Sequence, residues 1–247
     1  MTKASILDKE IKLLWGKGMG KCAICHCDLI QELIEGSPFL IGEMAHIEGE
    51  KEGSARFNQQ LCEKDRSKYP NLILLCPNHH TIVDKDLNTY TVENLRRIKK
   101  ESEEFFDDTL KSCISDITFA ELDQILKYII GVPNNHVFQT LTLIPLNEKI
   151  KNNSFSPDIQ TKILMGLTQV KQVKKYIETN PDLYYEERLQ SGFVKKYEEL
   201  FNQGIRGETL FYSLWDFASS YKNDYMNKAA GLSILVYFFE LCEVFSS

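Results

Sequence analysis

Cysteine and histidine, common protein ligands of transition metals, gather near the start of this 247-residue chain. Five of the seven cysteines and four of the five histidines lie within the first 80 residues. Two pairs have the spacing of metal knuckles, Cys22-x-x-Cys25 and Cys76-x-x-His79, in which a tight turn aims two ligands at one ion. Two such pairs complete a closed tetrahedral site, so we expect a structural Zn²⁺ that supplies folding free energy to a small core.

The membership of this site is open in one respect. Cys27 or His26 could replace a member of the first pair, although the two-residue spacing favours Cys25. The alternative without a metal is that Cys22 and Cys25 are an ordinary reduced pair. Cys62 lies in a polar connection and is predicted to be a bystander.

A second pattern overlaps the same segment. Ala45-His46-Ile47 is followed by Asn71-Leu-Ile-Leu-Leu-Cys76-Pro-Asn-His79-His80-Thr-Ile-Val-Asp84, and Tyr90-Thr-Val-Glu93-Asn-Leu95 lies downstream. This order is similar to the His-Asn-His motif of HNH (ββα-metal) endonucleases, in particular to the subgroup written AHI…NLILLCPxHH. The resemblance covers about residues 20–105 and implies a metal-dependent enzyme that hydrolyses phosphodiester bonds in DNA.

Hydrolysis of a phosphodiester needs a base for water and a cation for the charge that develops on phosphorus. His46 is the candidate general base, since an unperturbed imidazole pKa near 6.5 suits that role. His80 and Asp84 lie one helical turn apart and are candidate ligands for a catalytic Mg²⁺ or similar divalent ion. By analogy with the family, Asn71 holds the loop and orients the base.

The sequence departs from many HNH enzymes immediately before the candidate base. Those enzymes place an Asp or His there as a metal ligand, whereas this chain has Ala45, which is usual in the subgroup that it resembles. The catalytic ion is left with fewer obvious ligands, so Asp84 gains importance. Glu43 and Glu48 are further candidate helpers, with plain solvated carboxylates as the alternative.

Charge gives little support for a DNA-binding surface. The net charge is −6, and Met1–Phe106 contains 15 Lys and Arg against 17 Asp and Glu. A local basic patch or a partner must therefore supply affinity for phosphate. Arg56, Arg96 and Arg97 are the candidate phosphate contacts, although charged residues in such positions are commonly just solvated.

These residues need a small α+β scaffold to position them. We predict a helix that starts at Ser5–Asp8 and ends at Gly16–Gly20, and a strand over Phe39–Ile47. Gly49–Pro70 is expected to be irregular and Asn71–Cys76 to be a strand. A helix then begins at Pro77, and another runs from Thr91 to about Leu110. The expected domain is a zinc-stabilised ββα-metal module over residues 1–112.

Residues 113–247 are expected to form an all-α domain for partner binding or oligomerisation. Apolar periodicity predicts helices that include Phe119–Ile129 and that span Ile159–Ile177, Tyr185–Phe201, Thr209–Tyr221 and Tyr225–Phe245, with a break at Pro133–Asn135. The C-terminal end, with Glu186-Glu-Arg-Leu upstream, weakly resembles the helical domain of effectors in bacterial ABC-three-component conflict systems. That resemblance implies an anti-phage or anti-plasmid role beside an SMC- or RecN-like ABC ATPase, which would bring the DNA.

Two other classes of function remain open. One is a non-catalytic zinc module that binds nucleic acid or a protein partner, and the other is a scaffold or sensor whose helical half does the work. No secretory signal pattern is visible, and the most apolar stretch, Gly231–Phe245, is short and carries Glu240 and Glu243. We therefore expect a soluble, cytoplasmic protein, and duplex cleavage would take a homodimer or two successive nicks.

Overall fold

The computed structural model describes residues 6–31, 39–131, 145–219 and 222–241. Within these ranges the chain is a mixed α/β protein that is mostly helical, with two small two-stranded sheets. It divides into two compact units, Met1–Asp108 (unit 1) and Thr109–Ser247 (unit 2). This division and the expected domain boundary at residues 112/113 both fall within one long helix, α4 (Val92–Ile114).

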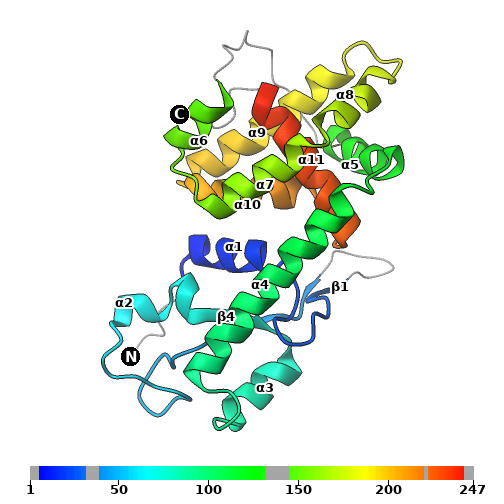
Figure 1. Ribbon diagram of the computed structural model, residues 1–247. Coiled ribbons are helices and arrows are strands. Elements are labelled where there is room, and N and C mark those ends of the chain that lie inside the picture. Colours follow the sequence, from blue (N-terminus) through cyan, green and yellow to red (C-terminus); the bar gives the residue numbers. More distant parts are fainter. Residues whose placement is uncertain (1–5, 32–38, 132–144, 220–221, 242–247) are drawn as a thin grey trace. The chain divides into compact units, whose positions relative to one another are not determined.

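Unit 1 holds all the described strands (Figure 1). After α1 (Asp8–Lys17), β1 (Ile30–Gln31) pairs antiparallel with β2 (Phe39–Leu40), and β3 (Glu43–His46) pairs antiparallel with β4 (Leu72–Leu75). The connection between β3 and β4 contains the short α2 (Glu63–Arg66) and the 3₁₀ turn η1 (Tyr69–Asn71). Helix α3 (Pro77–Lys85) follows β4 directly, and α3 packs against both β3 and β4.

The β3–β4 pair positions the candidate site residues, because β3 ends at His46 and β4 leads into the helix that carries His79 and His80. Its register sets Glu43 opposite Leu75 and His46 opposite Leu72, and every residue of β4 is buried. Pro77 occupies the first turn of α3, where its missing N–H costs no hydrogen bond. The buried strand Leu72–Leu75 is therefore followed directly by the helix that carries His79 and His80.

The prediction of one strand over Phe39–Ile47 is wrong, because this segment is divided between two sheets. β2 ends at Leu40 and β3 begins at Glu43. Gly42 lies in the gap, where a Cβ atom would stand 2.7 Å from Cη2 of Trp15 and 3.0 Å from Cβ of Leu29. The chain changes direction in a space that admits no side chain.

Unit 2 is all helix within its described residues. Its elements are α5 (Phe119–Gly131), α6 (Leu146–Asn152), α7 (Pro157–Leu167), α8 (Val170–Glu178), α9 (Tyr185–Asn202), α10 (Gly207–Ala218) and α11 (Tyr225–Leu241). Helix α11 packs against α5, α7, α8 and α10, and it is buried on nearly all sides (Figure 1). It is thus the core helix of this unit.

The described helices of unit 2 differ from the predicted ones at α6, α7 and α8. The single helix expected over Ile159–Ile177 is wrong, since α7 ends at Leu167 and α8 begins at Val170. Thr168 and Gln169 keep nearly helical dihedral angles, so the apolar period passes through the break almost unchanged. Helix α6 was not predicted, and the expected break at Pro133–Asn135 lies outside the described residues. None of the described helices is long and apolar enough to cross a membrane.

Candidate metal centre and histidine site

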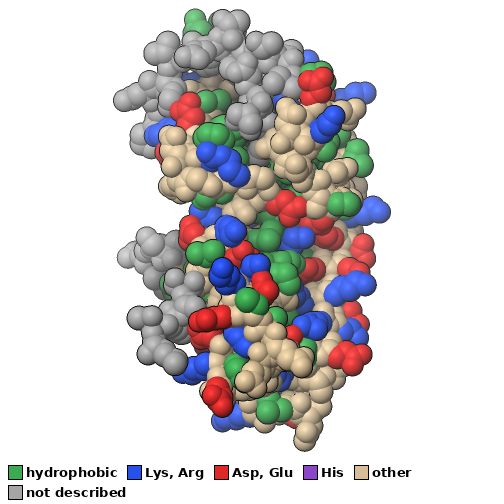
Figure 2. Space-filling view, turned by 90° about the vertical axis from the view of Figure 1, so that its left-hand side faces the viewer, with side chains coloured by type: hydrophobic (Ala, Val, Ile, Leu, Met, Phe, Trp, Pro, Cys, Tyr) green, Lys and Arg blue, Asp and Glu red, His purple; other side chains and the backbone are tan. Residues whose placement is uncertain are grey.

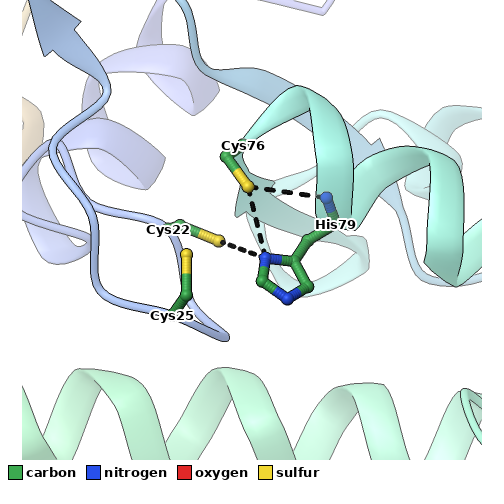
Figure 3. Close-up of side chains that lie close together, drawn as sticks. All are labelled: Cys22, Cys25, Cys76 and His79. Carbon is green, nitrogen blue, oxygen red and sulfur yellow. Dashed lines mark hydrogen bonds between the residues drawn. The ribbon is translucent and has the colours of Figure 1, made fainter.

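Four side chains from two distant segments converge in unit 1. Cys22 and Cys25 come from the turn after α1, whereas Cys76 lies between β4 and α3 as the N-cap of α3, and His79 is the third residue of α3 (Figure 3). The turn is closed by hydrogen bonds from Cys22 N to Cys27 O and from His26 N to Cys22 O. The ligand atoms of these four residues all lie within 4.8 Å of one another, so the cluster can hold a metal ion.

The donor set and its spacing fit zinc. The Nδ1 atom of His79 lies 3.7 Å from Sγ of Cys22 and 3.2 Å from Sγ of Cys76. Zn–S and Zn–N bonds of about 2.3 and 2.1 Å at a tetrahedral angle place N and S about 3.6 Å apart. The two measured distances bracket that value, and three thiols with one imidazole form a closed structural donor set.

The thiols of this cluster differ in their tendency to ionise. Burial raises the pKa of the Cys22 thiol to about 11. Burial also opposes ionisation of Cys76, yet hydrogen bonds from the His79 N–H and the neighbouring thiols leave its pKa below the ordinary value. Because metal-bound cysteines are thiolates, loading an ion into this cluster must displace protons.

The alternative ligands lie outside the set of four, although Cys27 contacts one of its members. The imidazole of His26 stacks on Phe105, with ring centroids 4.4 Å apart. Cys27 is exposed, with its Sγ 3.4 Å from that of Cys25, and it lies outside the set of four. Cys62 is also exposed and outside the cluster, as its position in the polar connection predicted.

A second group of polar side chains surrounds His80. Its Nδ1 lies 2.9 Å from Oε2 of Glu43 on β3, and its Nε2 lies 3.8 Å from Oδ2 of Asp84, one turn further along α3. The side chains of Glu43, His80 and Asp84 are 46%, 31% and 45% exposed, so a phosphate could approach them. Glu43, named from the sequence only as a candidate helper, thus contacts a proposed ligand directly.

Asn71 fixes the backbone next to His46. Its side-chain oxygen accepts from Glu48 N at 2.9 Å, and its amide nitrogen donates to Glu48 O and Arg66 O, each at 2.9 Å. The Asn71 carbonyl also accepts from Ile47 N at 2.8 Å. Since Asn71 is 5% exposed, these bonds hold the end of β3, where His46 lies half-buried.

No protein-family model matches this chain, and no curated protein matches it significantly.

Arg56 belongs to the protein interior. Its side chain is 5% exposed, and its backbone has a φ of 55°. The guanidinium donates to Ile47 O at 2.9 Å, to Val83 O at 2.6 Å and to Oδ1 of Asp84 at 2.8 Å. These donors are thus used within the protein, and contact between Arg56 and DNA stays a prediction.

The other two candidate phosphate contacts are exposed but paired with carboxylates. Arg96 forms an ion pair with the buried Glu48, and Arg97 pairs with Glu101 one turn along α4. Figure 2 shows Lys and Arg side chains interspersed with Asp and Glu over the face in view. A concentrated basic surface is not visible there, in line with the charge balance of the sequence.

Proposed function

We propose that unit 1 is an HNH-type, metal-dependent endonuclease module that cuts DNA and is stabilised by a zinc ion at Cys22, Cys25, Cys76 and His79. One observation carries this proposal. Nη2 of Arg56 lies 2.8 Å from Oδ1 of Asp84 and 3.5 Å from the carbonyl oxygen of His46. The strand end that carries the proposed base therefore lies beside the helix face that carries the proposed ligands.

The residues that would hold a catalytic divalent cation are His80 and Asp84. Two ligands at about 2.1 Å from one ion and at right angles stand about 3 Å apart. The observed 3.8 Å between Nε2 and Oδ2 comes within reach of this through small side-chain rotations. A bound Mg²⁺ or similar ion would stabilise the negative charge that develops on the phosphate.

The remaining steps fall to groups of the chain. His46 would accept a proton from the attacking water, a role that suits an imidazole at the half-buried end of a strand. Asn71 would keep this strand end in place through its hydrogen bonds with Ile47 and Glu48. The zinc cluster would fix the start of α3 against the turn after α1, and so fix the position of His80.

Plasmid cleavage by the purified protein with Mg²⁺ or Mn²⁺ tests the proposal. We expect nicking that depends on the ion and falls at least about 100-fold in His46→Ala, since loss of a general base typically costs that much. His136→Ala, in unit 2, is the control. Equal cleavage by wild type and His46→Ala would refute the assignment of His46. Absence of cleavage by both would favour a binding module or an enzyme that waits for a partner.

We further propose that unit 2 joins this module to a partner that delivers DNA, an SMC- or RecN-like ABC ATPase. The balanced charge of unit 1 and the paired state of Arg96 and Arg97 support a supply of phosphate affinity from elsewhere. Affinity purification from the native host should recover such an ATPase with the chain. Recovery of the chain without an ATPase would count against this partner.

A further inference from the structure

The two proposed metal ligands on α3 are each held by a side chain from another segment. Glu43 of β3 contacts Nδ1 of His80 at 2.9 Å, and Arg56 contacts Oδ1 of Asp84 at 2.8 Å. In each case the contact uses one polar atom of the ligand residue and leaves the other facing its neighbour. Nε2 of His80 and Oδ2 of Asp84 are the two atoms 3.8 Å apart.

We infer that Glu43 and Arg56 are positioning residues that aim Nε2 of His80 and Oδ2 of Asp84 at one divalent cation. The inference deepens the proposed function and rests on its catalytic ion site. It gives roles to two side chains that the motif alone leaves without one.

The chemistry of imidazole makes the role of Glu43 specific. A carboxylate only accepts hydrogen bonds, so the contact with Glu43 keeps the proton of neutral His80 on Nδ1. The lone pair is then on Nε2, which is the atom that faces Asp84. Histidines that bind metals commonly donate their second ring N–H to a carboxylate in this way, and loss of that partner typically lowers metal affinity about 10- to 100-fold.

Arg56 acts on the other ligand by geometry and charge. Its side chain is anchored by the carbonyl oxygens of Ile47 and Val83, so the nitrogen that reaches Asp84 has a fixed position. A rigid donor on Oδ1 restrains the rotation of the carboxylate and leaves Oδ2 for an ion. The same hydrogen bonds and the ion pair with Asp84 compensate for the burial of this cationic side chain.

Binding of Mn²⁺ to the zinc-loaded full chain, followed by electron paramagnetic resonance, tests the inference without relying on cleavage. Mn²⁺ prefers nitrogen and oxygen donors, so it does not compete for the thiolate cluster. We expect His80→Ala to abolish the site and Glu43→Leu to weaken binding about 10- to 100-fold. Glu43→Gln should lose less, because the amide oxygen can accept the same hydrogen bond. Glu93→Leu, at an exposed position of α4, is the control for charge removal.

The second readout is the tautomer of His80, measured by long-range ¹H–¹⁵N correlation in protein that holds zinc but no Mn²⁺. Wild type and Glu43→Gln should carry the proton on Nδ1, and Glu43→Leu should shift it toward Nε2. For the other ligand, Arg56→Lys should weaken Mn²⁺ binding. Arg66→Lys should not, because the buried Arg66 in the same connection donates to the carbonyl oxygens of Gly49, Asn58 and Leu61. Zinc content and circular dichroism verify that each variant is folded.

The outcomes separate the inference from the proposed function. The role of Glu43 would be overturned if Glu43→Leu leaves both the Mn²⁺ affinity and the His80 tautomer unchanged while His80→Ala abolishes Mn²⁺ binding. Equal losses in Arg56→Lys and Arg66→Lys would overturn the role of Arg56, and a wild type that binds no Mn²⁺ would overturn both. If binding responds as expected but plasmid DNA stays intact, the positioning roles hold and the nuclease proposal fails.

Discussion

At the scale of single residues, local spacing carried most of the successful inference. Cys22, Cys25, Cys76 and His79 do converge, because the turn that holds the first pair bonds to β4, directly before the second pair, from Ala23 N to Leu74 O. The contact between Glu43 and His80 could not be predicted from the sequence, since it joins a strand to a helix more than 30 residues later. For Arg56 the sequence does not show whether the side chain faces solvent or the interior, and in the structure it is buried.

Lys99 gives a prediction for pH dependence. It is 8% exposed and donates to the carbonyl oxygen of Leu72 at 2.8 Å, and burial lowers its pKa to about 8, against the pairing with Glu103. Between that value and the ordinary 10.5, the unfolded chain binds a proton that the native state has lost. The free energy of unfolding should therefore rise across this window, by at most about 3 kcal/mol from this group.

Urea unfolding of wild type and Lys99→Met between pH 7.5 and 10.5 measures this contribution as a difference. The difference between the two curves should change in favour of wild type as pH rises through about 8. Lys100→Met, on the exposed side of α4, is the control and should follow wild type. Parallel curves for wild type and Lys99→Met would show that Lys99 keeps an ordinary pKa.

At the scale of elements, the period of apolar residues found the long helices but missed where the chain bends. It predicted α5, α9, α10 and α11 within a few residues, because each buries one face or all faces over several turns. It missed the break between α7 and α8 and the break at Gly42. At Gly42 the contact that prevents one continuous strand comes from other segments of the chain. A steric limit set by Trp15 and Leu29 leaves no trace in the local pattern.

The contact between α7 and α11 depends on a residue without a side chain. A Cβ atom at Gly166 would lie 2.5 Å from Cγ2 and 2.8 Å from Cβ of Val236. Rotation of the valine side chain leaves its Cβ in place, so Gly166→Ala must push the two helices apart. We expect a loss of about 1–3 kcal/mol in the unfolding free energy of unit 2, as for other overpacked cores. Gly131→Ala, at the end of α5 with open space around it, should be neutral or slightly stabilising. Chemical unfolding followed by circular dichroism compares the two, and equal stabilities would argue against this close packing.

At the scale of the whole chain, the two units have different sources of stability. Unit 2 has a helical core centred on α11, and its described residues contain no candidate metal cluster. Unit 1 has a core that includes all of β4, and Cys22 and Cys76 are members of the same core. This difference between the units follows the sequence, because five of the seven cysteines and four of the five histidines lie in unit 1.

On the proposal that the cluster of unit 1 binds zinc, removal of the ion should unfold unit 1 and spare unit 2. A structural zinc contributes on the order of 10–16 kcal/mol, comparable with the whole stability of a domain at about 5–15 kcal/mol. A strong chelator, or Cys76→Ser, should abolish the tertiary signals of unit 1 and leave a cooperative helical transition from unit 2. Cys62→Ser should retain one zinc per chain and both transitions. Loss of all helical signal on chelation, or no change at all, would contradict this view.

An ion bound by Cys22, Cys25, Cys76 and His79 would also close a loop in the chain, since the two pairs lie at the ends of the segment 25–76. The entropy of closing such a loop grows only slowly with its length, by about 0.6 kcal/mol for each doubling. Within this loop, Gly53 is exposed, has a φ of 83° and has open space where a side chain would be. Related chains could therefore gain or lose residues at this point at little cost to the fold, which would make the tip of the β3–β4 connection a place for divergence in length.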